Sequence, residues 1–238
     1  MSRFKDFVRK SIFPNTYSSE AYINYLNKLG VKIGKKCYVF EPDTVSLDIA
    51  RPYLLEIGDN VVITKGVTVL THDYSHTVIR KKYGIQYGDA KEVKIGNNVF
   101  WGRDCLILMG TTIGDNVIVG AKSVVRGNIP SNVVIAGNPA TVVCTIEEFC
   151  EGRKKRELDC AKKNVQLCLE RLGRYPTIQE MGDAFAWLYL PRTQQTINEY
   201  PQFFDLPGDN KDDLISNFLG SKPMFDSYEQ FLNWAKGN

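Results

Sequence analysis

The chain has 238 residues, enough for one or two domains, and its 30 Lys and Arg against 27 Asp and Glu give a formal net charge of +3. So weak and scattered a basic excess argues against nucleic acid as a partner. No segment is long and apolar enough to span a membrane, and no apolar signal-peptide core is present, so we expect a cytoplasmic protein. Six cysteines without C-x-x-C spacing fit reduced thiols in that compartment.

Residues 1–30 predict an N-terminal helical segment. A short helix is expected over residues 18–29, with Ser18 or Ser19 as its cap and Gly30 at its end. The side chains before it are apolar and basic and can contact a membrane surface, but packing against the rest of the fold is the favoured interpretation. They are Arg3, Phe4, Lys5, Phe7, Val8, Arg9, Lys10, Ile12 and Phe13.

Apolar residues then recur at every sixth position. The clearest series is Ile95, Trp101, Ile107, Ile113, Val119 and Val125, and a second series four places later is Val99, Cys105, Thr111, Val117, Ser123 and Ile129. A period of six fits neither a helix nor a strand alone, but it fits a short strand and a tight turn in alternation. The repeat predicts a mainly β solenoid over residues 31–144, with coils of about eighteen residues and both series pointing inward.

Two further segments depart from this repeat. Residues 73–91 interrupt it as an inserted loop, which in a rigid solenoid usually carries function, with a disordered insertion as the alternative. Residues 145–238 change to helical spacing and predict an all-helical C-terminal extension. Capping boxes at Thr145–Glu148 and Thr177–Glu180 begin two helices, which end at Gly173 and near Leu190. Two more helices are expected over residues 210–219 and 227–236.

Histidine occurs only twice, at His72 and His76. His72 stands where the repeat gives way to the insertion. An imidazole can act as a general base near neutral pH, although a lone histidine is more often structural. Its position makes His72 the candidate catalytic residue.

Four motifs occur in order along the repeat, at residues 71–75, 93–102, 119–125 and 129–140. They read Thr-His-Asp-Tyr-Ser, Val-Lys-Ile-Gly-Asn-Asn-Val-Phe-Trp-Gly, Val-Gly-Ala-Lys-Ser-Val-Val and Ile-Pro-Ser-Asn-Val-Val-Ile-Ala-Gly-Asn-Pro-Ala. Together they resemble the hexapeptide-repeat sugar O-acetyltransferases, including the galactoside, maltose and nodulation-factor enzymes and their relatives in capsule and O-antigen gene sets. The resemblance covers about residues 30–145.

This resemblance implies a left-handed parallel β-helix, a homotrimer and three active sites between adjacent prisms. It also implies acetyl-coenzyme A as the acetyl donor and a sugar or oligosaccharide as the acceptor. His72 corresponds to the catalytic histidine, which deprotonates a sugar hydroxyl for direct attack on the thioester. A backbone amide near Gly102–Arg103 corresponds to the group that stabilises the oxyanion. No metal is expected.

The resemblance further implies a set of cofactor-binding residues, which is Trp101, Gly102, Arg103, Gly120, Ala121, Lys122, Arg126, Asn138, Pro139 and Thr141. On the acceptor side it implies Asp48, which either orients His72 or binds sugar hydroxyls. Asp73, His76 and Tyr83 are expected to bind the acceptor because they lie in the inserted loop. This chain departs from the family at Arg103, Arg126-Gly127 and Thr141. We therefore expect Arg126, Lys122 or an N-terminal arm to contact the coenzyme phosphates.

Several functions use this fold. The expected function is O-acetylation of a sugar hydroxyl in surface polysaccharide biosynthesis. N-acetylation of an amino sugar, or acetylation of an antibiotic, is the alternative. A zinc enzyme of the carbonic anhydrase type would need three histidine ligands, which two histidines four positions apart fit poorly. A non-catalytic scaffold is a further interpretation, because a fold does not determine function.

Overall fold

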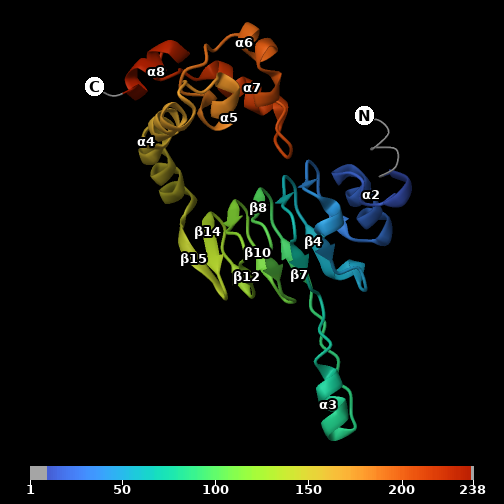
Figure 1. Cartoon of the computed structure of the whole chain (residues 1–238). Helices are drawn as coiled ribbons and strands as arrows, with labels where there is room; N and C mark the ends of the chain where they lie inside the picture. The colour runs from blue at the N-terminus through green and yellow to red at the C-terminus, as the bar shows by residue number, and fades with distance from the viewer. Residues whose placement is uncertain (1–9, 237–238) are drawn as a thin grey trace. The chain divides into compact units, whose positions relative to one another are not determined.

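The chain divides into two compact units, Met1–Phe149 and Cys150–Asn238, and the computed structural model describes residues 10–236 of it (Figure 1). Residues 3–9, which carry most of the predicted N-terminal membrane or packing contacts, lie outside the described residues. Ile12 and Phe13 belong to the same predicted set and are described; their side chains are 61% and 51% exposed, so they are not part of a core.

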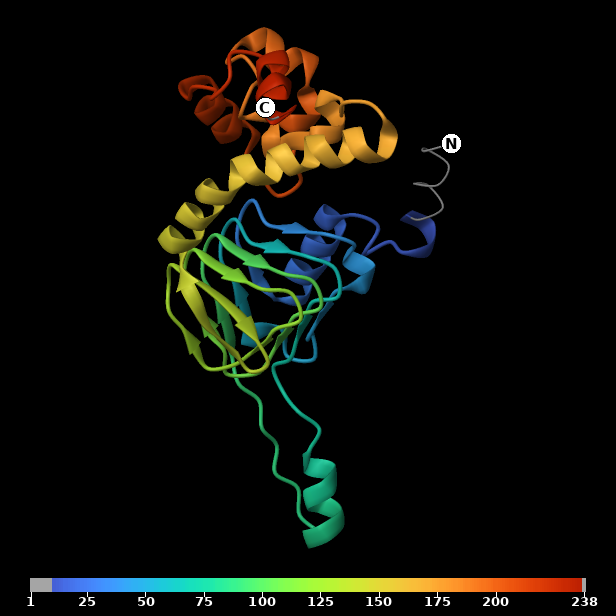
Figure 2. The ribbon, with the colours of Figure 1, turned by 60° about the vertical axis from the view of Figure 1, so that its left-hand side comes forward.

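Three sheets of short strands form the faces of a triangular β-helix in the first unit (Figure 2). Sheet A consists of β1 (Lys32–Ile33), β4 (Leu55–Ile57), β7 (Val93–Ile95), β10 (Thr112–Ile113) and β13 (Asn128–Ile129). Sheet B consists of β2 (Tyr38–Val39), β5 (Val62–Ile63), β8 (Val99–Trp101), β11 (Val117–Val119), β14 (Val133–Gly137) and β15 (Ala140–Thr145). Sheet C consists of β3 (Ser46–Leu47), β6 (Thr68–Val69), β9 (Leu106–Ile107) and β12 (Val124–Val125). Neighbouring strands are parallel, except that β15 returns antiparallel to β14.

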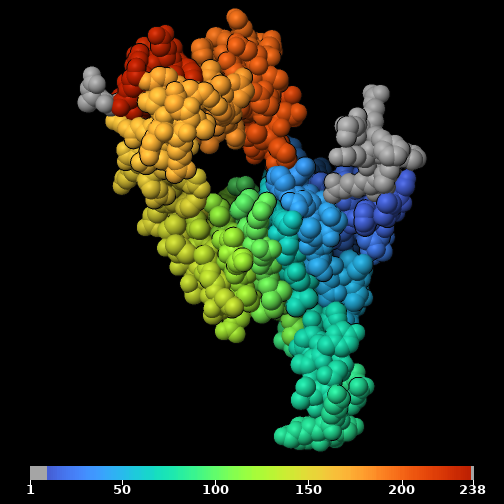
Figure 3. All heavy atoms as spheres, in the orientation of Figure 1, coloured from blue at the N-terminus to red at the C-terminus, as the bar shows by residue number. Residues whose placement is uncertain are grey.

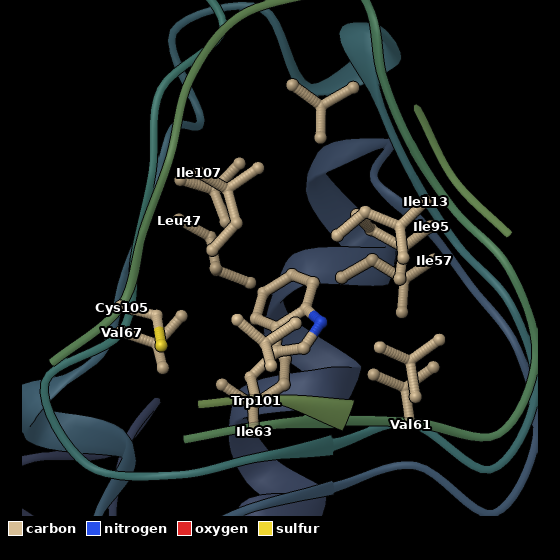
Figure 4. Close-up of a cluster of buried hydrophobic side chains, with 14 of the residues drawn as sticks. Leu47, Ile57, Val61, Ile63, Val67, Ile95, Trp101, Cys105, Ile107 and Ile113 are labelled. Carbon is tan, nitrogen blue, oxygen red and sulfur yellow. The ribbon is translucent and has the colours of Figure 1, made fainter. Parts of the chain in front are cut away.

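The predicted eighteen-residue coil is confirmed by the register of the strands. Ile113 pairs with Ile95, Val119 with Trp101, and Val125 with Ile107. All six residues of the first series are at most 3% exposed. The side chains of Ile95, Trp101, Ile107 and Ile113 stack with those of neighbouring coils inside the prism (Figure 4). Because the inward side chains at equivalent positions are closely packed, each coil fixes the register of the next coil.

The last coil departs from this register. Ile129 was expected in the second inward series, but it pairs with Ile113 of the first series, sixteen positions earlier. The turn between β12 and β13 is therefore two residues shorter than the turns of the regular repeat between Ile95 and Val125. Gly127 supplies the left-handed backbone of this tight turn, with a φ of 74°.

The edge where the chain passes from sheet A to sheet B, the A–B edge, is closed by a ladder of side chains. Asp59 accepts a hydrogen bond from the amide of Lys35 at 2.6 Å, and Asn97 accepts one from the amide of Asp59 at 2.8 Å. Asp115 continues the ladder with the amide of Asn97 at 2.6 Å. These bonds satisfy turn amides that the strand ladders leave free, so the polar side chains of the A–B edge have a structural role.

The insertion leaves the prism between β6 and β7. Ile57 pairs with Ile95 across 38 positions, so this coil contains twenty more residues than the eighteen of a regular coil. The added segment projects as a narrow arm that carries helix α3 (His76–Tyr83), a helix that the sequence analysis did not predict (Figure 3). At its base the amide of Lys91 donates to the carbonyl of Thr71 at 2.9 Å.

Helix α2 (Ser19–Leu29) precedes the first strand and confirms the predicted cap and end. The hydroxyl of Ser18 accepts from the amide of Ala21 at 3.1 Å, and Gly30 is left-handed with a φ of 102°. Tyr22 and Leu26 are buried in the core of the β-helix. Two 3-10 helices follow, η1 (Pro42–Thr44) and η2 (Pro52–Leu54).

The second unit is helical, as expected. Its helices are α4 (Ile146–Leu172), which begins in the first unit, α5 (Ile178–Ala186), α6 (Gln194–Glu199), η3 (Pro201–Phe203), α7 (Lys211–Gly220) and α8 (Tyr228–Lys236). Both predicted capping boxes form. Helix α5 ends four residues before Leu190, and α6 was not predicted. Within residues 10–236, no helix combines the length and apolarity needed to cross a membrane.

We expect Ile107→Ala to lower the free energy of unfolding by about 3 kcal/mol, because it opens a cavity in a fully buried column. Thr112→Ala, on the exposed face of β10, should change it by less than about 0.5 kcal/mol. Urea unfolding at one fixed protein concentration measures both. Equal losses in the two variants would contradict the inward assignment.

Candidate active site

The predicted site residues lie on two different edges of the β-helix. The C–A edge, where the chain passes from sheet C to sheet A, follows β3, β6, β9 and β12 and therefore carries Asp48, His72 and Arg126. The B–C edge follows β5, β8 and β11 and carries residues 102–103 and 120–122. The width of sheet C separates the two edges within one chain. The structure thus brings Asp48 and His72 together but keeps them apart from most of the predicted cofactor residues.

His72 is held by Asp48 from the preceding coil. Its Nδ1 lies 2.5 Å from Oδ2 of Asp48, and its side chain is 20% exposed. A carboxylate can only accept, so Nδ1 carries the proton in the neutral imidazole and Nε2 has a free lone pair. This geometry supports the first of the two roles predicted for Asp48, orientation of the histidine.

Asp48 is itself fixed by its surroundings. Its Oδ2 also accepts from the amide of Thr71 at 3.0 Å and from the Thr71 hydroxyl at 2.7 Å, and its Oδ1 accepts from the amide of Ala50 at 3.0 Å. Burial raises the pKa of Asp48, but the hydrogen bonds from Thr71, Ala50 and His72 outweigh burial and lower that pKa to about 2. The carboxylate is therefore ionised at neutral pH and accepts the hydrogen bond from Nδ1 of His72.

A hollow of about 720 Å³ opens beside His72; we call it the His72 hollow. It is lined by Ala50, Arg51, Tyr53, His72, Asp73, Tyr74, His76, Gln86, Gly88, Asp89 and Ala90. Two predicted acceptor residues, Asp73 and His76, are among them. Tyr83 is not, since it lies at the end of α3 and is 62% exposed.

Sequence reasoning missed several residues of this hollow. Arg51 and Tyr53 follow Asp48 in the turn between β3 and β4, and Gln86 and Asp89 lie in the returning half of the arm. The ring of Tyr74 meets that of His72 edge-on at 5.5 Å between centroids. The pairing of Leu47 with Val69, which places the residues just after each strand on one edge, is visible only in the structure, so the sequence carries no signal for Arg51 and Tyr53.

The B–C edge carries two exposed basic side chains, Arg103 and Lys122. A Cβ on Gly102 would lie 2.5 Å from the amide nitrogen of Ala121, so only glycine allows the coils to stack here. The amide of Gly102 donates to the carbonyl of Val119 at 2.8 Å. Of the two amides predicted to bind an oxyanion, that of Arg103 is therefore the better candidate.

The remaining predicted cofactor residues fall in three places. Asn138 and Pro139 are exposed in the turn after β14, at the same B–C edge, and Thr141 is exposed on β15. Arg126 lies on the C–A edge with His72. Trp101 is fully buried and points into the prism, so its side chain is a core residue and cannot contact a cofactor (Figure 4).

Within residues 10–236, no three His, Cys, Asp or Glu side chains gather as they would around a metal ion. The chemistry available at His72 is proton transfer by a neutral imidazole whose tautomer is set by a carboxylate. A triangular parallel β-helix with such a pair at one edge defines a hexapeptide-repeat enzyme.

Comparison with known proteins assigns the family. Residues 92–127 match the bacterial transferase hexapeptide family (six repeats). Protein CapG of Staphylococcus aureus is 43% identical over 138 residues, which cover 58% of this chain and 78% of CapG. The putative lipopolysaccharide biosynthesis O-acetyl transferase WbbJ of Escherichia coli K12 is 51% identical over 133 residues, covering 50% of this chain and 68% of WbbJ. The galactoside O-acetyltransferase of the same organism is 39% identical over 120 residues, covering 50% of this chain and 55% of that enzyme.

The chain belongs to the bacterial hexapeptide transferase family, and it is a transferase.

The hydrogen bonds that Asp48 accepts, from Thr71 first and then from Ala50 and His72, predict a pH-dependent contribution to stability. The pKa of Asp48 is lowered from 3.8 to about 2 on folding, so the carboxylate stabilises the fold above its unfolded pKa. That stabilisation disappears as the pH falls through the folded pKa. We expect Asp48→Asn to lower the free energy of unfolding by about 2 kcal/mol at neutral pH, and the difference from wild type to shrink below about pH 4.

Urea unfolding of both proteins at several pH values tests this expectation. A difference that stays constant down to the lowest accessible pH would show that ionisation of Asp48 is not responsible.

Proposed function

We propose that this protein transfers the acetyl group of acetyl-coenzyme A to a hydroxyl of a sugar, in the biosynthesis of a surface polysaccharide. The observation that carries the proposal is the hydrogen bond between His72 and Asp48 at the edge of a hexapeptide β-helix. Relatives named as galactoside and lipopolysaccharide O-acetyltransferases support the reaction and the class of acceptor.

The proposed reaction needs one general base. Nε2 of His72 takes the proton of the acceptor hydroxyl while the oxygen of that hydroxyl attacks the carbonyl carbon of the thioester. The tetrahedral intermediate then expels the coenzyme A sulfur, and the imidazolium returns the proton to that thiolate. The products are an acetyl ester and free coenzyme A. Asp48 keeps His72 in the tautomer that is protonated at Nδ1, and it offsets the positive charge that the imidazolium carries between the two proton transfers.

The B–C edge is the proposed donor side. Its two exposed cations suit the phosphates of coenzyme A, and the small residues at Gly120 and Ala121 leave room for a slender pantetheine chain. The amide of Arg103 is the proposed donor to the oxyanion. Asn138, Pro139 and Thr141 extend this side toward the last coil.

The separation of the two edges is the argument for an oligomeric site. A base on the C–A edge and a donor on the B–C edge of one prism cannot meet, but the two edges can face each other between neighbouring copies. A closed ring of three copies gives three equivalent sites. We therefore propose a homotrimer, with the left-handed winding that the family resemblance implies.

Residues 31–144 are the proposed acetyltransferase domain, with the arm of residues 73–91 contributing to the acceptor side. Residues 145–238 are proposed as a separate helical extension. The relatives cover only part of this chain, which agrees with an added unit.

His72→Ala and His72→Asn should both lower kcat by about 100- to 10,000-fold, because neither side chain can take the proton. Asparagine can still hydrogen-bond Asp48, so it controls for loss of that contact. Release of coenzyme A from acetyl-coenzyme A, followed with a thiol reagent against a panel of sugars, measures the rate. Size-exclusion chromatography checks that the assembly persists.

A folded His72→Asn protein that retains wild-type turnover would sink the proposed mechanism. Faster acetylation of amines than of hydroxyls in the same panel would replace O-acetylation by the N-acetyltransferase alternative.

A further inference from the structure

Two carboxylates, those of Asp73 and Asp89, and the guanidinium of Arg51 line the His72 hollow, and the carboxylate of Asp48 contacts His72 beside it. Asp48 is bonded by Thr71, Ala50 and His72. Asp73 accepts from the amide of Ser75 at 2.9 Å and from its hydroxyl at 2.8 Å. Asp89 is paired with Lys91 at 3.0 Å. Every carboxylate of the hollow is therefore engaged within the chain.

The hydrogen bonds within the arm also keep Asp73 ionised. The hydroxyl and amide of Ser75 hold the pKa of Asp73 below its usual value, with smaller contributions from His76 and His72. Asp73 is thus held in place within the arm by its own neighbour, Ser75.

Arg51 also lines the hollow, and its guanidinium has a different environment from the carboxylates. Within the described part of the chain its guanidinium forms neither an ion pair nor a hydrogen bond, and it lines the same hollow as His72. It stands at the start of η2 (Pro52–Leu54), where the amide of Leu54 donates to its carbonyl at 2.9 Å and fixes the turn. Asp48, three residues earlier, is anchored to the neighbouring coil, so the backbone on both sides of Arg51 is held.

A guanidinium presents a planar fork of donors that matches a carboxylate or a phosphate in two parallel hydrogen bonds. The other groups of the hollow suit a neutral sugar ring. The rings of Tyr53 and Tyr74 are 73% and 70% exposed, and Gln86 offers an amide to hydroxyls. Arg51 and these groups together fit a sugar that carries one anionic group.

We infer that the acceptor is an acidic sugar, and that Arg51 binds its carboxylate or phosphate while a hydroxyl faces His72. This inference rests on the proposed function and specifies the acceptor for that site. Arg51 is a binding residue for specificity and takes no part in proton transfer.

The test uses matched acceptors with the full-length protein at low ionic strength. Methyl glucuronide carries a carboxylate where methyl glucoside carries a hydroxymethyl group, and glucose 6-phosphate and glucose 1-phosphate supply a phosphate on either side of the ring oxygen. We expect kcat/KM for at least one anionic sugar to exceed that for methyl glucoside by about tenfold or more. Arg51→Gln should abolish that preference, because it lowers kcat/KM far more for the anionic sugar than for methyl glucoside, and Arg51→Lys should keep part of it. The anion that is favoured identifies the source of the charge.

A binding measurement separates this inference from the proposed function. Calorimetry with the His72→Asn protein should show the same preference for the anionic sugar, lost on adding Arg51→Gln, whether or not acetyl transfer occurs. Equal binding and turnover of charged and neutral sugars would overturn the inference and leave O-acetylation standing. A lower oligomeric mass of Arg51→Gln by sedimentation would also overturn it, because Arg51 would then pair with a neighbouring copy.

Discussion

Each coil of the β-helix must repeat the register of the coil before it, because its inward side chains stack in columns along the axis. Ile95 and Ile113, or Trp101 and Val119, occupy equivalent positions eighteen residues apart, with almost no exposed surface. A column tolerates neither an added nor a missing inward residue without a cavity or a clash. Extra residues and special turns can therefore occur only at the three edges, and the groups capable of chemistry are found there.

The pairing of His72 with Asp48 follows from this constraint. Leu47 and Val69 are opposite each other in sheet C, and the amide of Asp48 donates to the carbonyl of Val69 at 3.0 Å. The residues just beyond the two strands are then adjacent at the C–A edge. The arm leaves the prism directly after this point, so its returning half lines a hollow beside His72. The same register places Arg103 and Lys122 on another edge, which is why one chain holds only part of the proposed site.

Much of this arrangement could be predicted from the sequence. Inward positions follow from a period of six, since only one side of each short strand can face the axis, and the helices of the second unit follow from capping boxes such as that of Thr177 and Glu180. His72 could be singled out because it stands where the period breaks. The shortened turn before Ile129 could not be predicted from the sequence, because Arg126-Gly127-Asn128 has the composition of any turn. The length of this turn is visible only in the strand pairing. Trp101 was assigned to the cofactor from its motif, although its own place in the inward series predicts burial. Arg51 was missed because an isolated arginine in a turn carries no sequence signal, and its meaning comes from the coil that lies beside it.

The central claim is that the site combines the C–A edge of one copy with the B–C edge of another. Mixing two inactive variants tests it most directly: His72→Ala, which removes the base, and Ala121→Trp, which blocks the exposed donor edge. After the two proteins are unfolded and refolded together in equal amounts, about a quarter of the interfaces should combine an intact His72 with an intact donor edge, and activity should return to about that fraction of wild type. Activity no greater than the sum of the two parent variants would show that each site is built from a single chain.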